Sequence, residues 1–317
     1  MKTALFEGIG RVARAPAILA GVWLVTILVS LPLTLGVRAM IAQHLGSSLA
    51  ADTALSGVNY DWWQEFSDQA TGPGVTFTPT IIGFGAVLDN LSAFLDDEHR
   101  PVIIVSFASA YILIWIFLAG GIIDRYTRGA RGSGEFFGAC GRFFGRFLRL
   151  AVMMWIVYAF LFAYMHRWLF DRLFTSMTRD LSVERTAFLA RVALYLVFGL
   201  VFAGCNLIFD YTKVRTVVED RRSMLAAVPA AVRFIRKNYT SAVGLYAADF
   251  ALFVLVLACY ALVAPGAGSG GWSLWIGFAV SQIYIVLRLF VKLVFWASET
   301  ALVEARSGVA AATPPPA

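Results

Sequence analysis

Few side chains in this sequence have the types and spacing that catalysis or metal binding requires. The three histidines, His44, His99 and His166, are far apart, and the sequence contains neither an HExxH nor a CxxC spacing. It also lacks a P-loop and a dinucleotide-binding glycine fingerprint. The glycine-rich run at 129–134 follows an apolar stretch instead of a strand, which argues against a phosphate-binding loop. We therefore expect no catalytic residue, no metal site and no cofactor.

Asp249 is the side chain that departs most from its surroundings, because it interrupts the apolar stretch 240–263. Counted along a helix at about 1.5 Å per residue it lies roughly 13 Å into that stretch, where an ionised carboxylate costs several kcal/mol unless it is paired or hydrated. Polar partners expected at a comparable depth are Asn206, Gln282 and Arg288. Two hypotheses stay open: Asp249 binds a proton or a substrate in a transport path, or it is a neutral or paired residue that fixes helix register.

Membrane-spanning helices have to position these side chains. Of the 317 residues 59% are hydrophobic and 15% charged, and the mean hydropathy is +0.74, whereas soluble domains are about 45–50% apolar and about 25% charged. The excess lies in six stretches long enough to cross a bilayer core of about 30 Å. We predict an all-α, polytopic six-helix bundle that forms a single transmembrane domain over 1–309. The predicted spans are 15–37, 101–123, 150–168, 190–210, 240–263 and 272–296.

The N-terminal region has features of a signal peptide, and the C-terminal region has the composition of a disordered tail. Lys2, Arg11 and Arg14 precede the first apolar stretch, as in a secretory signal peptide. Its apolar part is longer than the about 7 to 15 residues of a signal sequence, which favours an uncleaved first span. The last residues, 310–317, are small and rich in proline, and we expect a disordered tail there.

The distribution of Lys and Arg predicts the orientation, because basic residues stay on the cytoplasmic side. With the N-terminus inside, 19 of the 26 Lys and Arg residues are cytoplasmic, and both termini face the cytoplasm. The first outer segment contains eight acidic residues between Arg38 and Arg100. The net charge of +6 is thus explained by topology, and we infer no nucleic-acid binding from it. The use of 22 Arg and 4 Lys is compatible with a bacterium of high genomic GC content.

Two stretches on the predicted cytoplasmic side combine basic with apolar residues at helical spacing. Such patterns are typical of amphipathic helices that lie in the headgroup plane, with their basic side chains on anionic phosphates. We therefore predict two interfacial helices and anionic inner-leaflet lipids as partners. Positive-inside anchoring without lipid selectivity explains the same pattern. The candidate headgroup ligands are Arg142, Arg146, Arg149, Arg233, Arg236 and Lys237.

Each basic stretch follows a similar motif at the end of an apolar stretch. Residues 124–128 read Asp-Arg-Tyr-Thr-Arg, and residues 210–213 read Asp-Tyr-Thr-Lys. The similarity indicates that the second and third spans and the fourth and fifth spans are duplicated hairpins. Chance similarity at a membrane exit explains it as well.

The second motif continues through 210–223 as Asp-Tyr-Thr-Lys-Val-Arg-Thr-Val-Val-Glu-Asp-Arg-Arg-Ser, followed by an alanine-rich helix and a span. This arrangement resembles the YciC-like six-span bacterial inner-membrane proteins and the membrane domain of some glycerophosphodiester phosphodiesterases. The resemblance covers the fourth and fifth spans and their connection. It implies a fold type and carries over no phosphodiesterase chemistry.

The segment 39–100 is too long for a simple turn, and we predict a small outer cap. Apolar residues at helical spacing over 87–95 predict a helix in it, and Val75 to Thr78 predict a short extended piece. Four aromatic residues beside two acids are typical of an interfacial anchor. This aromatic patch consists of Tyr60, Trp62, Trp63 and Phe66.

For function, the sequence favours a non-catalytic accessory, scaffold or lipid-interacting membrane protein, whose partners would be lipids, another membrane protein or a second copy. One alternative is a small permease that uses Asp249 with Arg288 and Gln282. Another is a membrane enzyme that acts on lipids. A hydrated path would favour the permease, and dry packing of Asp249 would favour the scaffold.

Overall fold

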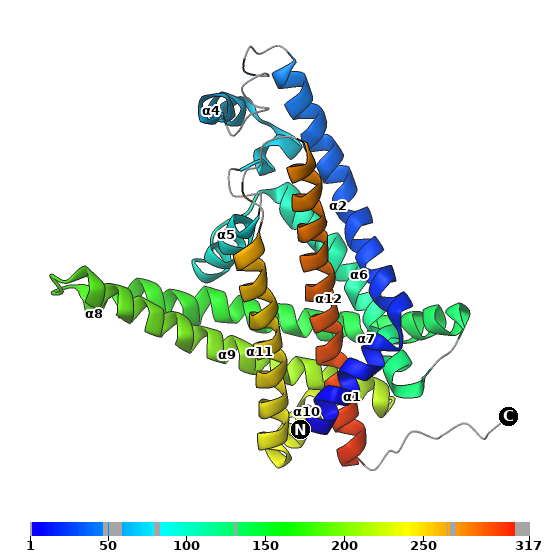
Figure 1. The fold of residues 1–317 in the computed structure, drawn as a ribbon. Coiled ribbons are helices and arrows are strands. Elements are labelled where there is room, and N and C mark those ends of the chain that lie inside the picture. Colours follow the sequence, from blue (N-terminus) through cyan, green and yellow to red (C-terminus); the bar gives the residue numbers. More distant parts are fainter. Residues whose placement is uncertain are drawn as a thin grey trace. The chain divides into compact units, whose positions relative to one another are not determined.

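The computed structural model describes residues 2–46, 50, 59–78, 83–129, 132–264, 266 and 271–307 (Figure 1). These residues are 89% helical and contain no strand. Six helical segments are long and apolar enough to cross a membrane, which confirms the predicted six-span all-α class. The predicted tail at 310–317 lies outside the described residues. The six segments are α2 (Pro16–Leu45), α6 (Val102–Arg128), a segment over Ser133–Thr178 that begins with α7 (Ser133–Phe160), α9 (Glu184–Val218), α11 (Tyr239–Val263) and α12 (Trp272–Ser307).

The remaining helices are shorter and connect or flank the long ones. The π-helical turns η3 (Leu161–His166) and η4 (Trp168–Phe174) and the short helix α8 (Thr175–Thr178) complete the segment that α7 begins. The short helices are α1 (Lys2–Ala13), α4 (Tyr60–Gln69), η1 (Gly72–Thr76), α5 (Phe84–Leu95), η3 (Leu161–His166), η4 (Trp168–Phe174), α8 (Thr175–Thr178) and α10 (Met224–Lys237).

The first predicted interfacial helix is not a separate element. Its arginines lie on the N-terminal half of α7, which runs unbroken from Ser133 to Phe160. Phe143, Phe147 and Leu150 follow one another at i, i+4 and i+7 and are buried, so one apolar stripe continues through the predicted boundary. The second basic stretch does form its own helix, α10.

The described part of the segment 39–100 contains the predicted helix but only part of the predicted extended piece. The helix predicted over 87–95 is present as α5, which starts at Phe84. The extended piece predicted at Val75 to Thr78 is wrong for its first two residues, which end the 3-10 helix η1. The hydroxyl of Thr76 donates to the carbonyl of Pro73 at 2.8 Å, a local bond that stabilises the turn over an extended strand.

The contacts of the chain divide it into two compact units. Unit 1 comprises the described residues of Met1–Arg11, Trp115–Ala248 and Val294–Ala317, and unit 2 comprises those of Val12–Ile114 and Asp249–Leu293. The core of unit 1 is built where α10 packs on the end of α9. Its buried members come from α1, α9, α10, α11 and α12 and include Tyr211, Val214, Ala231, Ala242, Leu245 and Leu302.

Within unit 1 the C-terminal part of α12 is buried on all sides, from Trp296 to Glu304. Helix α1 crosses it in backbone contact, because a Cβ atom on Gly8 would lie 2.7 Å from the Ser298 Cα. Next to this crossing, Arg11 donates to the Glu304 carboxylate at 2.6 Å and to the carbonyl of Tyr126 at 2.8 Å. The buried carboxylate of Glu304 is therefore paired, as buried charges generally are.

Unit 2 is held together by polar and aromatic contacts between its helices. The indole N–H of Trp23 donates to the Gln282 amide oxygen at 3.1 Å. The hydroxyls of Thr26 and Tyr111 are 3.0 Å apart, within hydrogen-bonding distance. The rings of Tyr260 and Tyr284 stack with their centroids 3.9 Å apart. These contacts join α2, α6, α11 and α12 inside the unit.

Candidate functional site

The turn after α9 has an unusual residue at its critical position. Arg221 N–H donates to the Thr216 carbonyl at 3.0 Å and Asp220 N–H donates to the Val217 carbonyl at 3.4 Å, which is the Schellman pattern of a helix C-terminus. The residue between the helix cap and Arg221 must take a left-handed conformation, and glycine usually fills it. Here Asp220 takes it, with φ of 48°. The turn thus places a carboxylate where the backbone alone would favour glycine.

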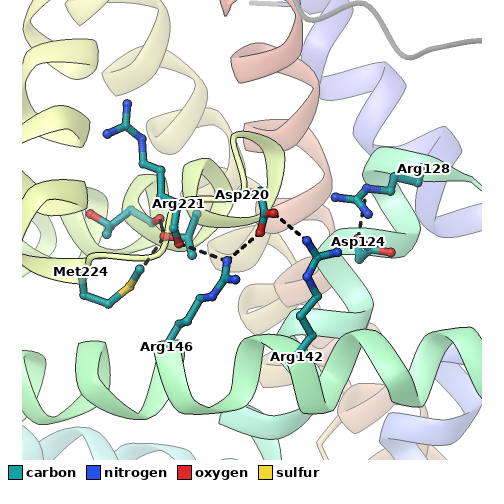
Figure 2. Close-up of polar contacts among 9 residues, drawn as sticks. Asp124, Arg128, Arg142, Arg146, Asp220, Arg221 and Met224 are labelled. Atoms are coloured by element: carbon teal, nitrogen blue, oxygen red, sulfur yellow. Dashed lines mark hydrogen bonds and ion pairs between the residues drawn. The ribbon is translucent and has the colours of Figure 1, made fainter.

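Two arginines of α7 bind this carboxylate. Arg142 Nη2 lies 2.6 Å from Asp220 Oδ2, and Arg146 Nη1 lies 2.7 Å from Asp220 Oδ1. Arg146 also donates to the carbonyl of Arg221 at 3.1 Å. Figure 2 shows both side chains rising from the same face of α7 toward the turn. Because the two arginines are four residues apart, they lie one helical turn apart on that face.

A second group of charges ties the same turn to α10. Glu219 binds Arg215 at 2.7 Å and also pairs with Arg221. Arg215 in addition donates to the carbonyl of Ala230 on α10, and its guanidinium lies over the ring of Phe234 at 5.3 Å. The turn is therefore held from two sides, by α7 through Asp220 and by α10 through Glu219 and Arg215.

The electrostatics of Asp220 follow from this geometry. The hydrogen bond from Arg146, with the charge of Arg142, holds the pKa of the Asp220 carboxyl below its ordinary value, although partial burial opposes this. The carboxylate is thus ionised at neutral pH, and two positive charges meet a single negative one. The arrangement can bind an anion. A carboxyl group whose pKa is lowered is a poor proton donor at neutral pH.

Helix α10 presents its basic residues on an uncovered face. Ser223 caps it, with the Ser223 hydroxyl accepting from the Ala226 N–H at 3.4 Å. The helix contains no acidic residue. Its packed face consists of Met224, Ala227, Ala230, Ala231, Phe234 and Ile235, all buried. Its uncovered face consists of Leu225, Ala226, Pro229, Arg233, Arg236 and Lys237, all exposed.

The six predicted headgroup ligands thus fall into two groups. Arg142 and Arg146 bind Asp220. Arg149 is exposed one turn further along α7, and the three basic residues of α10 are exposed as well. We call Arg233, Arg236 and Lys237 the α10 basic face.

The residues predicted near Asp249 have contacts of their own. Asp249 has no exposed surface and lies in α11. Gln282 binds Trp23 in unit 2, whereas Asn206 lies in unit 1 and accepts from the hydroxyl of Tyr158 at 2.6 Å. Arg288 is exposed, and its guanidinium lies over the ring of Tyr284 at 6.0 Å. The burial of Asp249 agrees with both hypotheses for it.

The aromatic patch of Tyr60, Trp62, Trp63 and Phe66 has two buried and two more exposed members. Trp62 and Phe66 are 7% and 3% exposed, and their rings stack on one another. The indole N–H of Trp62 donates to Nδ1 of His44 at 2.9 Å, a link between α4 and the end of α2. Tyr60 is 60% exposed, and Trp63 is half-buried and donates to the carbonyl of Phe77 at 3.1 Å.

The repeated motif takes a similar local structure in both places. Asp124 pairs with Arg128 at 3.3 Å on α6, and Asp210 pairs with Lys213 at 2.7 Å on α9. The tyrosines Tyr126 and Tyr211 are both buried. Both motifs continue their helices, and the duplication of the two hairpins stays a prediction.

Sequence reasoning missed Asp220 and Glu219, which bring the arginines together. The signal that was available is a pair of acids placed between the end of a long apolar helix and the serine cap of the next one. Among the residues that the structure describes, no three histidine, cysteine or acidic side chains gather as a metal ion would require.

Comparison with known proteins gives no relative. No protein-family model, no curated protein and no solved structure matches the chain.

Proposed function

We propose that the chain is a non-catalytic integral protein of the bacterial inner membrane that binds anionic lipid headgroups at the inner leaflet, with both termini in the cytoplasm. The observation that supports this most is the α10 basic face: three basic side chains and no acid on a helix whose other face is packed into the protein. The excess of Lys and Arg in the segments assigned to the cytoplasm supports the orientation. Accessory and scaffold roles belong to the same proposal, since lipid binding would hold the chain beside a partner.

The resemblance of 210–223 to the YciC-like six-span proteins is part of the proposal as well. The stretch forms the end of α9, the Asp220 turn and the cap of α10, so it contains the residues that orient the α10 basic face. A shared arrangement at this place would explain the shared motif.

Titration of the purified chain with anionic lipid tests the proposal. We expect phosphatidylglycerol to bind more tightly than phosphatidylcholine. The triple variant Arg233→Gln, Arg236→Gln, Lys237→Gln should lose this preference, and at about 1 kcal/mol per basic side chain the loss is on the order of a hundredfold. The matched control removes three exposed charges elsewhere, by Arg167→Gln, Arg172→Gln and Arg179→Gln. Equal lipid affinity of the two triple variants would contradict the proposal.

A second candidate function is a small permease, in which the carboxyl group of Asp249 within the apolar helix α11 would bind a proton or a substrate; its complete burial fits this role and the register role equally. Proteoliposomes loaded with a pH-sensitive dye test it. If Asp249 conducts protons, Asp249→Asn stops proton uptake and leaves the unfolding temperature unchanged. If Asp249 fixes helix register, the variant unfolds at a lower temperature and no proton uptake is seen in either protein.

A further inference from the structure

Aspartate is an uncommon residue at the left-handed position of the turn after α9. The left-handed position of a Schellman turn needs no side chain, and glycine adopts it with the least strain. Asp220 occupies it at φ of 48° and uses its carboxylate to bind Arg142 and Arg146. The ion pairs of its carboxylate, and not the backbone conformation, therefore explain why an aspartate occupies this position.

The two arginines form a site that suits a phosphate group as well as a carboxylate. Arginine presents its N–H groups in a planar fork that matches both anions, and charge-assisted bonds of this kind are short. The bonds to Asp220, at 2.6 and 2.7 Å, have this character. The two guanidinium groups and the carboxylate together have a net charge of one positive unit, which attracts a further anion.

The site is also open to exchange. The side chains of Arg142 and Asp220 are 46% and 39% exposed, so a ligand can reach both without unfolding the turn. Arg146 is 15% exposed and is held by the Arg221 carbonyl as well as by Asp220, which keeps one arginine in place while the carboxylate leaves. The pair of Arg142 with Asp220 is exposed on both sides and therefore weak, so that a phosphate can compete with it.

We propose that Arg142 and Arg146 form a phosphate-binding site that Asp220 fills when no phosphate is bound. This inference rests on the proposed function in one respect, since the phosphate of a lipid headgroup is the ligand that this function would supply. Two residues after Asp220 stands Arg222, exposed and directly before the cap of α10. A headgroup bound at the site would thus lie near the start of the helix that carries the α10 basic face.

The test uses the full chain in a neutral detergent and two probes, short-chain phosphatidylglycerol and inorganic phosphate. Asp220→Asn removes the competing carboxylate and should raise the affinity of the chain for the bound probe by up to about fivefold, the factor that corresponds to the free energy of one exposed ion pair. Adding Arg142→Gln and Arg146→Gln should abolish this gain. Glu135→Gln, which removes an exposed negative charge from the same helix, is the control for net charge.

Asp220→Gly repeats the experiment with the residue that the turn favours, so a gain in affinity seen in both variants does not come from backbone strain in the turn. A gain for the lipid alone assigns the site to a headgroup, and a gain for both probes assigns it to phosphate in general; either supports the site. If the Asp220 variants bind the probes no more tightly than Glu135→Gln does, the proposed site is wrong and Asp220 is a structural link only. The α10 triple variant separates this failure from that of the proposed function, because it would still weaken lipid binding.

Discussion

Arg146 Nη1 lies 2.7 Å from Asp220 Oδ1 and 3.1 Å from the carbonyl oxygen of Arg221, so one guanidinium group of α7 holds both the side chain and the backbone of the turn after α9. The turn also begins α10, whose direction is therefore fixed by a contact from α7. Together with the contacts of Arg215 to Glu219 and Ala230, this link orients the α10 basic face.

Loss of Arg146 should destabilise the chain more than loss of a neighbouring arginine. Arg146→Gln removes two charge-assisted hydrogen bonds of a side chain that is 15% exposed, and we expect a cost of about 1.5–3 kcal/mol. Arg149→Gln, on an exposed position of the same helix, should stay within about 0.5 kcal/mol of the parent. Denaturation in detergent measures both. Equal effects of the two substitutions would show that the link adds no stability.

The left-handed conformation of Asp220 can be tested apart from its charge. Asp220→Gly and Asp220→Ala both remove the ion pairs, but only alanine has to adopt φ of 48° with a Cβ atom. We expect the alanine variant to be less stable by about 1 kcal/mol. A comparison of the two unfolding free energies gives this difference directly, and a value near zero would mean that the turn relaxes.

The dependence of stability on pH should identify the Asp220 ion pair. The pKa of this carboxyl is lowered from its ordinary value of 3.8 in the folded chain. Its contribution to stability is thus complete above the unfolded pKa and disappears as the pH falls through the lower folded pKa. The difference in stability between the parent and Asp220→Asn should be constant from pH 5 to 8 and shrink below pH 3.8. A difference that changes around neutral pH would point to another group.

The contact between α6 and α7 should tolerate no added methyl group. A Cβ atom on Gly121 would lie 2.5 Å from Cys140 Sγ and 2.8 Å from the Phe136 carbonyl oxygen, and the latter belongs to the backbone. We expect Gly121→Ala to cost about 1–3 kcal/mol. A Cβ atom on Gly199 of α9 would have no neighbouring atom within 4 Å. Gly199→Ala should therefore stabilise the chain by less than about 1 kcal/mol. Thermal unfolding in detergent distinguishes the two.

Cysteine labelling tests the proposed orientation, but the native cysteines do not suit it. Cys140 is fully buried, so a failure to label it reports burial as much as topology. Gln64 on α4 and Ser133 at the start of α7 are exposed, and each can be replaced by cysteine in a chain without its native cysteines. A membrane-impermeant maleimide should label the first in intact cells and the second only after lysis. The reverse pattern would invert the topology.

The apolar stretches were sufficient to predict the six long helices, because span length follows from bilayer thickness. They could not show that α7 continues through its basic half, since a stripe such as Phe143, Phe147 and Leu150 serves an interfacial helix and a packed one equally. Depth along a helix likewise says nothing about direction around it. Depth alone gave Asn206 and Gln282 as candidate partners of Asp249; the structure shows their bonds to Tyr158 and Trp23, and a contact of either with Asp249 stays a prediction.

The candidate site was predictable in its basic residues and not in its acidic ones. Arg142 and Arg146 stand out by their spacing, but their partner Asp220 is 74 residues away from Arg146. Only packing of α7 against the end of α9 brings the three together. The aromatic residues of the cap show the same limit, since the bond from Trp62 to His44 depends on how α4 folds back on α2.

The most direct measurement is gentle extraction of the native chain from its membrane, followed by intact-mass and lipid analysis of what remains bound. Lipid binding through the α10 basic face predicts that the retained lipids are richer in anionic headgroups than the bulk membrane. The Arg233→Gln, Arg236→Gln, Lys237→Gln variant should then lose this enrichment. Retained lipids of bulk composition on the parent chain, or equal enrichment on the variant, would contradict the proposed function.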